Sequence, residues 1–590
     1  MIAGLKERLA AIPPLIWLLF LVAACLALFA GKAFHIDDTL FLRAAEQIQK
    51  HPVDFYGFKM NWYGSTRPMI ENFDNPPLAC YYIALAAAIF GWSEPVLHLA
   101  FIVPALAAAW GTGSLAKHYC GRPVLAAALS VLTPVFLISA TTLMCDVILL
   151  AFWVWSVVFF EEGLQRGDSR VFLISGLLAG LAFCAKFSGL ALVPLLAAYG
   201  LCRQRRIGRW LVAPLLPLLF AAGYEWLTHH LYGKGMLLAA ATVSSTVTSA
   251  RGAGFWETQM VGLGFVGGCF IPVLLYAPWL WSGRSMLKLL CVIVPCLLLY
   301  PYSARFALLL WRPDGRPDWF LCALSAVLIA GGIHLLLLAA TECWKRGDAV
   351  SLLLFLWILG IFIFATSVNW TLNGRSLLPM APAVGILVAR RLDRMLPFHP
   401  GSSGPVRWLA APAAAISLVL ANADYELAGV GRTAAKDLCA NHKPVGRTLW
   451  FQGHWGFQYY MEQRGARPLE RDFALPVPGD VVIVPAQAVN TFDLATNLVR
   501  FVASLEYPLN THCSTMSVSA GAGFYAATAA PFPFSAGYID HELYFIFEVT
   551  QKLTGSSPAP AGLFVSGAVM QQLERARQAR FRPSQTRGPP

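Results

Sequence analysis

Blocks of about twenty apolar residues recur along the 590-residue chain, and they restrict the fold more than any other feature. A helix of that length is needed to cross the hydrocarbon of a bilayer, roughly 30 Å thick. The chain is 57% hydrophobic and 13% charged, whereas about a quarter of the residues in soluble domains are charged. The sequence therefore predicts an all-α polytopic membrane bundle and excludes a soluble globular protein.

We expect about thirteen membrane-spanning helices and interpret the first as a retained anchor, because it lacks a convincing cleavage site. The expected spans are 14–31, 96–116, 123–141, 143–160, 171–185, 187–201, 210–227, 260–281, 286–302, 318–340, 350–368, 375–390 and 407–421. The apolar segment 77–90 is too short for a crossing and predicts an interfacial or re-entrant helix. An amphipathic helix that begins at Asp38 is expected to lie along the membrane.

Basic residues gather in loops on one side of this arrangement, so the net charge of +12 needs no nucleic acid to explain it. The clusters are Lys6 with Arg8, 203–209, Arg284 with Lys288, Lys345 with Arg346, and 390–394. The positive-inside rule places that side, and the N-terminus with it, in the cytoplasm. An odd number of spans then puts the C-terminal region outside, in a multi-pass protein of the inner (plasma) membrane.

The composition changes after residue 421 and divides the chain into three parts. We expect a transmembrane domain over 1–421 with an external loop at 32–95, an extracytoplasmic α/β domain over 422–570, and a disordered tail over 571–590. The second part contains expected strands at 448–451 and 480–485, an expected helix at 455–464, and alternating apolar residues over 506–550.

Two adjacent carboxylates, Asp37 and Asp38, stand where the chain leaves the bilayer after the first span. Charged groups at a membrane boundary are costly to desolvate and often mark chemistry or ion handling. A carboxylate within hydrogen-bond reach of a hydroxyl can act as a general base, with its neighbour orienting it or binding a metal. The alternative is that Asp38 only caps the following helix and Asp37 is a solvated boundary residue.

Three further charged residues lie at the same outer level. Asp146 begins the fourth span, where a carboxylate also suits the helix dipole. Lys186 and Arg375 lie at span ends on the outer face, against the positive-inside trend, and would suit a phosphate. Either cation could instead be a snorkelling anchor. His229 and His230 could bind a metal, although surface histidines are commoner.

The order of these residues resembles that in the C-type (GT-C) glycosyltransferases. The branch concerned contains protein O-mannosyltransferases, lipid A aminoarabinose transferases and lipopolysaccharide-core transferases. The matching motifs are Asp37-Asp38, Asn75-Pro76-Pro77-Leu78, Asp146, Ala185-Lys186-Phe187-Ser188, and Arg375 with Leu377-Leu378-Pro379. Two positions depart from the family pattern. Asp38 replaces the usual Glu, and Asn75 replaces the usual His, which removes a titratable group.

The resemblance implies a GT-C bundle whose donor is a sugar on a polyprenyl phosphate. It implies Asp37 as the catalytic base with Asp38 as its partner, and Lys186 and Arg375 as ligands of the donor phosphate. Asn75 and Asp146 would position substrate, and Asp146 could also bind a divalent metal ion. The acceptor would be a lipid, glycan or protein hydroxyl on the outer face, and neither the acceptor nor the sugar can be chosen from the sequence.

Two other functions remain open at this point. The donor could be a polyprenyl-diphosphate oligosaccharide, as in oligosaccharyl transferases. The protein could also be a transporter, but transporters often consist of repeated halves with polar groups near mid-membrane. No repeat is detectable, and the conspicuous polar residues lie at one face. Glycosyl transfer is therefore the favoured interpretation.

Overall fold

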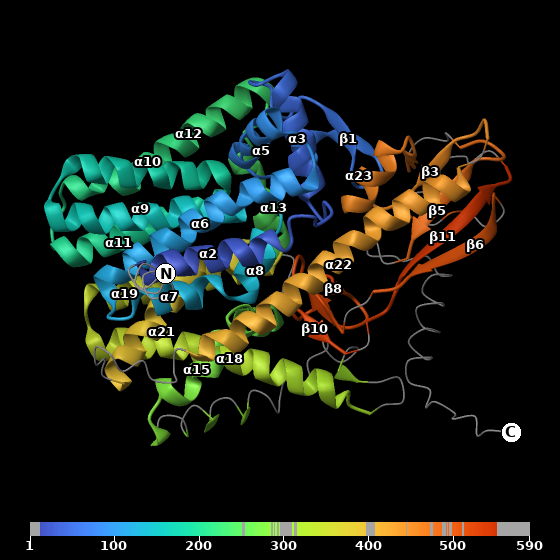
Figure 1. Cartoon of the computed structure of the whole chain (residues 1–590). Helices are drawn as coiled ribbons and strands as arrows, with labels where there is room; N and C mark the ends of the chain where they lie inside the picture. Colours follow the sequence, from blue (N-terminus) through green and yellow to red (C-terminus); the bar gives the residue numbers. More distant parts are fainter. Residues whose placement is uncertain are drawn as a thin grey trace, which may run out of the picture.

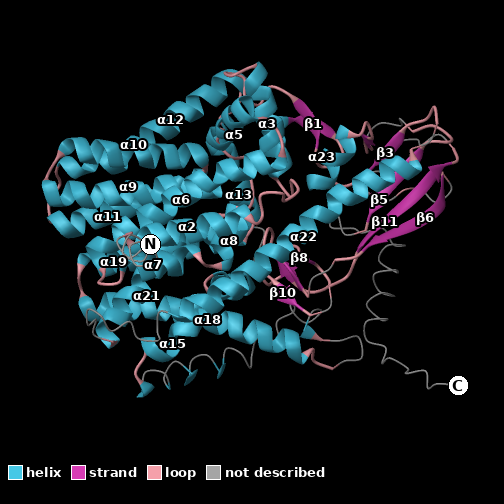
Figure 2. Cartoon of the chain, viewed as in Figure 1, coloured by secondary structure: helices cyan, strands magenta, loops and turns pink. Residues whose placement is uncertain are grey.

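The computed structural model describes residues 12–551, except 250–253, most of 285–315, 397–407, residue 444 and short stretches between 472 and 538. A helical bundle makes up most of this part, and a small α/β domain projects from one end of it (Figures 1 and 2). The tail predicted over 571–590 and most of the span predicted at 286–302 lie outside the described residues.

In the part of the chain that the structure describes, six helices are long and apolar enough to cross a membrane. They are α6 (Glu94–Tyr119), α9 (Asp146–Arg166), α12 (Val212–Tyr232, preceded by η2, Arg209–Leu211), α18 (Trp319–Arg346), α19 (Ala349–Ile363, continued by η5, Phe364–Val368) and α22 (Ala410–His442). Two bent pairs could each form a further span, which gives up to eight in the described part of the chain. A multi-pass bundle is thus confirmed, whereas the count of thirteen spans is not.

The bent pairs break where proline begins the second helix. In the first pair, α7 (Pro123–Val131) meets α8 (Pro134–Ala140) at 63°, and Thr133 caps α8 by accepting a hydrogen bond from the Phe136 amide. In the second, α14 (Phe255–Cys269) meets α15 (Ile271–Leu280) at 81°. Pro134 and Pro272 lack an amide hydrogen, so they start helices readily but cannot continue the preceding one. Each predicted span is therefore two short helices.

The remaining helices are short. They are α2 (Pro14–Ala27), α3 (Asp38–Lys50), α4 (Met69–Asn72), α5 (Leu78–Phe90), α10 (Ser169–Ala185), η1 (Phe187–Ala191), α11 (Leu192–Gln204), α13 (Met236–Ser249), α20 (Gly374–Leu377), η6 (Leu378–Met380), α21 (Ala381–Met395) and α23 (Trp455–Gln463). The amphipathic helix expected after residue 37 is α3, whose apolar face is buried, and the short apolar segment 77–90 forms α5.

Close approach of helix backbones holds α14 against α18. A Cβ atom added to Gly267 would lie 1.8 Å from the Leu328 carbonyl oxygen, and one added to Gly332 would lie 2.1 Å from that of Leu263. Only glycine fits at both positions. Small residues at such contacts are how helices pack tightly in lipid, where apolar side chains gain little by leaving their surroundings.

The α/β domain has a five-stranded sheet in the order β4-β3-β5-β11-β6. The three strands β3 (Leu449–Phe451), β4 (Arg467–Pro468) and β5 (Val481–Pro485) run parallel, and β11 (Glu542–Val549) lies antiparallel between β5 and β6 (Val499–Tyr507). The strands expected at 448–451 and 480–485 and the helix expected at 455–464 are thus present as β3, β5 and α23. Short strand pairs form elsewhere: β1 (Lys59–Asn61) with β2 (Thr66–Pro68), β7 (Cys513–Ser514) with β10 (Ser535–Ala536), and β8 (Met516–Ser517) with β9 (Ala522–Gly523).

The domain boundary predicted at residues 421 and 422 falls inside α22. This helix has 33 residues and runs without a break from the bundle to the α/β domain (Figure 1). At 1.5 Å per residue it is about 50 Å long. The apolar run ends near residue 421, but the helix continues, because about half of the following residues are good helix formers such as Ala, Glu and Leu and none is Pro.

Basic clusters meet at the bundle end far from the α/β domain. The buried carboxylate of Glu342 on α18 pairs with Arg346 of its own helix and with Arg391 and Arg394 of α21. The clusters 345–346 and 390–394 therefore lie close together, which is compatible with their predicted place on one side of the membrane. Which face of the membrane they occupy stays a prediction.

Candidate functional site

The turn that leads from the first helix into α3 presents two neighbouring carboxylates in different surroundings. Ile36 has a φ of 49°, a left-handed conformation that costs energy for a β-branched residue. The side chain of Asp37 is 31% exposed, whereas Asp38 is completely buried. The turn therefore leaves Asp37 open to a ligand and withdraws Asp38 into the protein.

Asp38 connects two backbone segments. One carboxylate oxygen accepts a hydrogen bond from the His35 amide at 3.0 Å, and the other accepts one from the Leu143 amide at 2.8 Å. Burial raises the pKa of Asp38 to about 7, although these two hydrogen bonds act in the opposite direction. Its side chain does not cap α3, as the alternative interpretation expected, but fixes the Asp37 turn against the loop before α9.

Arg375 joins Asp37 to Asp146. The Arg375 Nη2 atom donates to Asp37 Oδ2 at 3.0 Å, and its Nη1 atom lies 3.7 Å from Asp146 Oδ2 and also contacts the Met144 sulfur. Asn373 caps the short helix α20 by accepting a hydrogen bond from the Ser376 amide. This cap sets where Arg375 leaves the backbone.

Lys186 completes a row of alternating charges. Its Nζ atom donates to Asp146 Oδ1 at 2.7 Å. Asp146 is the first residue of α9, and Lys186 directly follows α10, so the ends of two adjacent helices supply the pair. The row runs Asp37, Arg375, Asp146, Lys186, and it contains four of the residues singled out in the sequence.

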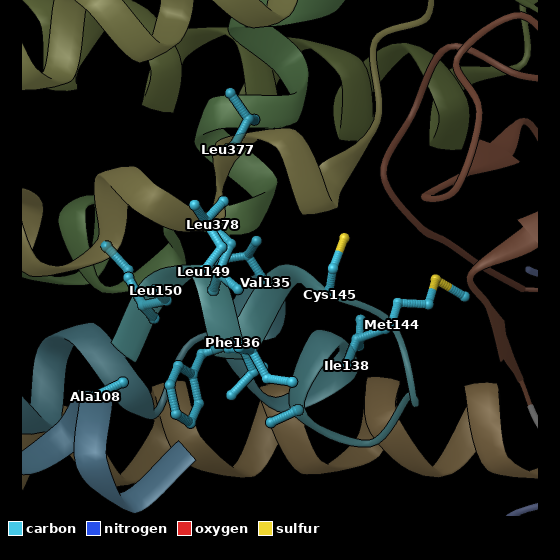
Figure 3. Packing of buried hydrophobic residues seen from close by; sticks show 14 of the residues in the cluster. Ala108, Val135, Phe136, Ile138, Met144, Cys145, Leu149, Leu150, Leu377 and Leu378 are labelled. Atoms are coloured by element: carbon cyan, nitrogen blue, oxygen red, sulfur yellow. The ribbon is translucent and has the colours of Figure 1, made fainter. Parts of the chain in front are cut away.

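Buried apolar side chains pack between α8, the first turns of α9 and the segment that follows Arg375 (Figure 3). Leu377 and Leu378 follow Arg375. Leu378 lies near Leu149, Val135 and Phe136, whereas Leu377 lies away from them (Figure 3). All five side chains are buried. Because such a core transmits small changes in side-chain volume, the separation of Arg375 from Asp146 depends on this packing.

Asn75 does not join the row. Its backbone carbonyl accepts a hydrogen bond from the Tyr56 hydroxyl at 2.6 Å, which fixes the loop before α5. Among the contacts of the described residues, its side chain touches none of Asp37, Asp146, Lys186 or Arg375. A substrate-positioning role for Asn75 therefore stays a prediction.

A second buried cluster lies beside the row and was missed in the sequence. Asp424 of α22 accepts hydrogen bonds from Lys32, Thr515 and Tyr525, and both charged side chains have no exposed surface. The Tyr525 ring lies 5.5 Å from the Arg375 guanidinium carbon. Asp424 and Lys32 could have been noticed in the sequence, because each is a charged residue within an apolar segment. Nothing in the sequence distinguishes Tyr525 in this way.

The surroundings of Asp146 do not fit a divalent metal ion. Both of its oxygens face cations, Lys186 at 2.7 Å and Arg375 at 3.7 Å, which would repel a metal. Across the described residues, no group of three or more His, Cys, Asp or Glu side chains could hold one. The geometry suits an anion beside the two cations better.

Comparison with known proteins found a family model that matches one segment of the bundle. Residues 74–226, which contain Asp146 and Lys186, match the model of the family described as dolichyl-phosphate-mannose-protein mannosyltransferase. This match supports the resemblance stated from the sequence over residues 74–226. A comparison with curated proteins found no match.

Three solved structures show a distant similarity to this chain. An oligosaccharyltransferase of Archaeoglobus fulgidus is 16% identical with a TM-score of 0.45, over 77% of this chain and 64% of that one. ArnT of Cupriavidus metallidurans bound to undecaprenyl phosphate is 14% identical with a TM-score of 0.37. The similarity covers 80% of this chain and 92% of ArnT. The mycobacterial arabinofuranosyltransferase AftD is 11% identical with a TM-score of 0.39. The similarity covers 96% of this chain and 43% of AftD. The chain thus spans less than two thirds of the oligosaccharyltransferase.

Proposed function

We propose that the protein is an integral-membrane inverting glycosyltransferase that moves a sugar from a polyprenyl phosphate to an acceptor hydroxyl. One observation carries the proposal: a partly exposed carboxylate, Asp37, lies directly beside the row Arg375, Asp146 and Lys186. A base and a phosphate site are the two parts that such a transfer requires. The family matched by residues 74–226 is named for a dolichyl-phosphate-linked sugar and a protein acceptor.

Asp37 is the proposed base because it is the only member of the acidic pair with exposed surface. Both oxygens of Asp38 are already used by backbone amides. Asp38 therefore acts as a positioning residue that holds the turn carrying Asp37. A base must reach the hydroxyl that it deprotonates, and reach distinguishes the two residues.

Arg375 and Lys186 are the proposed ligands of the donor phosphate. The buried Arg375 Nε atom has no hydrogen-bond partner within the described part of the chain, so a phosphate oxygen would satisfy a donor that is otherwise unpaired. The family matched by residues 74–226 is named for dolichyl-phosphate-mannose, a donor in which a single phosphate carries the sugar. A monophosphate donor is therefore preferred over a polyprenyl-diphosphate donor.

The proposed reaction is a single displacement at the anomeric carbon. The acceptor oxygen forms a bond to that carbon while its proton passes to the Asp37 carboxylate. The bond from the same carbon to the phosphate oxygen breaks, and its electron pair leaves with the polyprenyl phosphate. Charge on the departing phosphate increases, and Arg375 and Lys186 stabilise it in surroundings of low dielectric. Asp146 holds the two cations apart and in place.

The row lies at the end of the bundle that carries the α/β domain, away from the basic clusters around Glu342. With those clusters in the cytoplasm, the reaction would take place on the outer face of the inner membrane. The acceptor would then be a cell-envelope lipid, glycan or protein, with hexosyl and pentosyl donors both open.

The test is transfer from defined donors by the purified full chain reconstituted in sealed lipid vesicles. Undecaprenyl phosphates that carry radiolabelled hexoses or pentoses would be incubated with envelope extract from a strain lacking the gene. We expect labelled product with inverted anomeric configuration and release of undecaprenyl phosphate. Transfer from a diphosphate-linked donor alone would contradict the monophosphate assignment, and label that crosses vesicles unchanged would indicate a transporter.

A further inference from the structure

A segment of the α/β domain returns to the bundle and contacts the loop that carries Arg375. The Gly374 amide donates to the Phe524 carbonyl at 2.7 Å, and the Ala527 amide donates to the Leu372 carbonyl at 2.8 Å. A Cβ atom at Gly374 would lie 2.3 Å from the Phe524 ring. Backbone hydrogen bonds on both sides of Tyr525 therefore fix the loop immediately before Arg375.

The Tyr525 ring contacts Arg375 itself and His35, which lies two residues before Asp37. Its ring centroid lies 5.5 Å from the Arg375 guanidinium carbon, within the range of a cation–π interaction. The same ring meets the His35 ring edge-on at 5.9 Å. His35 belongs to the turn that presents Asp37, so one aromatic ring contacts both Arg375 and the turn that carries Asp37.

The position of the Tyr525 ring is itself fixed by a buried charge pair. Its hydroxyl donates to Asp424 Oδ2 at 2.7 Å, and Asp424 is neutralised by Lys32 and bound by Thr515. Lys32 comes from the end of the first apolar segment, and Asp424 comes from α22. A buried pair with these hydrogen bonds has little freedom to move, because each alternative position would leave a charge unpaired.

We propose that Tyr525 is a positioning residue of the transfer reaction, one that holds the Arg375 guanidinium by its face and leaves its N–H edge for the donor phosphate. The inference rests on the proposed function. A hydrogen-bonding partner would consume N–H donors of Arg375, whereas a ring under the guanidinium plane consumes none. Tyr525 can therefore keep Arg375 in place when its contact with Asp37 is exchanged for a contact with phosphate.

Three variants of the full chain test this role. Tyr525→Leu removes the ring, Tyr525→Phe keeps the ring but loses the hydroxyl, and Tyr544→Leu is the matched control. Tyr544 is also a buried tyrosine of the α/β domain, but its ring contacts are Phe457 and Tyr507 in that domain. Tyr525→Leu should lower kcat/KM for the polyprenyl-phosphate donor about 5- to 30-fold. Tyr525→Phe should restore most of the loss, and Tyr544→Leu should cause little.

A double variant separates positioning from general stability. If Tyr525 acts through Arg375, adding Tyr525→Leu to Arg375→Ala should cause no further loss of kcat/KM, because the group it positions is already gone. A purely structural role would give losses that multiply. Multiplying losses, or a Tyr525→Leu enzyme with the kcat/KM of wild type, would overturn the inference.

A measurement that does not depend on enzymatic turnover tests the role of Tyr525 separately from the proposed function. Phenylglyoxal modifies exposed guanidinium groups, and mass spectrometry would measure its rate at Arg375 in each folded variant. We expect faster modification of Arg375 in Tyr525→Leu than in Tyr525→Phe and Tyr544→Leu. Equal rates would contradict positioning by Tyr525 even in an active enzyme. A wild-type protein without transfer, but with the expected pattern of modification, would contradict only the proposed function.

Discussion

Arg375 donates to the carboxylate of Asp37 at 3.0 Å, so the proposed phosphate ligand and the proposed base are each other's partner in the structure. Binding of a donor phosphate would draw the guanidinium toward a second anion and weaken its hold on Asp37. The base would then be free to accept a proton only when a donor is present. Such an arrangement would favour transfer over wasteful deprotonation of water.

Removing the basicity of Asp37 tests the base assignment. Asp37→Asn keeps the shape of the side chain, and we expect roughly a 10²- to 10⁴-fold loss of transfer, the usual contribution of positioned proton transfer. The measurement is radiolabelled transfer by purified protein, with thermal unfolding as a check on folding. Asp393→Asn is the matched control, because Asp393 also pairs with an arginine, Arg122, but at the end of α21. Retention of more than about a tenth of the activity would contradict the assignment.

Removing either cation should weaken use of the donor. Lys186→Ala and Arg375→Ala each delete a charge-assisted contact with phosphate, worth roughly 1.5–3 kcal/mol, or about ten- to more than a hundred-fold in kcat/KM. Arg375→Lys should rescue only in part, because an ammonium group cannot replace the planar fork of donors. Arg122→Ala provides the control for loss of an arginine. Wild-type rates at sub-saturating donor in both alanine variants would identify these cations as membrane anchors.

Stability should depend on pH through Asp38. Its pKa is raised from 3.8 to about 7 in the folded protein, so between these values the fold retains a proton that the unfolded chain has released. The stability from this group is complete below about pH 4 and is lost as the pH rises through about 7. Asp38→Asn should flatten this part of the profile of Tm against pH. An unchanged profile would show that Asp38 does not titrate there.

The buried pair Lys32 and Asp424 should show strong coupling. Lys32→Met leaves the Asp424 carboxylate buried without its cation, and we expect a loss of about 3–5 kcal/mol in the free energy of unfolding. The double variant Lys32→Met with Asp424→Leu removes both charges and should recover much of that loss. Denaturant unfolding of the single and double variants measures the coupling. Additive losses would mean that the two charges do not stabilise each other.

The predicted orientation can be tested with single cysteines in a cysteine-free chain. Gly208 has an extended backbone and open space for a side chain, and Gln463 is exposed at the end of α23. An impermeant thiol reagent applied to intact cells should label Gln463→Cys and leave Gly208→Cys unlabelled. Labelling of Gly208→Cys would reverse the assignment of the basic loops to the cytoplasm.

Local sequence patterns predicted where helices and strands lie better than they predicted how long these elements are. The apolar blocks located the helices, but Pro134 and Pro272 turn two expected spans into bent pairs. Helix α13 was not expected, because its many Ser and Thr residues carry neither a strong apolar stripe nor a cap. In the α/β domain, the order of the strands in the sheet depends on long-range pairing that alternating apolar residues do not encode.

Residues of the candidate site could be predicted where a charged side chain was expected at the outer membrane surface. Asp37, Asp146, Lys186 and Arg375 were found because ionised groups at a bilayer surface are conspicuous in an apolar chain. Tyr525 was not found, because a buried tyrosine is ordinary in composition and its role depends on a contact across 150 residues to Arg375. Nor could the sequence show that adjacent Asp37 and Asp38 differ in exposure, since that depends on the turn at Ile36.

The unbroken helix α22 makes the two halves of the protein inseparable. It carries Asp424, which needs Lys32 from the bundle, and it leads to the segment that supplies Tyr525. A cut at residues 421 and 422 would leave a membrane half without the ring under Arg375 and a soluble half with an orphaned carboxylate. Chimeras between relatives would therefore have to exchange 32–39, the middle of α22 and 515–527 as one set. For engineering purposes the catalytic unit is the whole described chain.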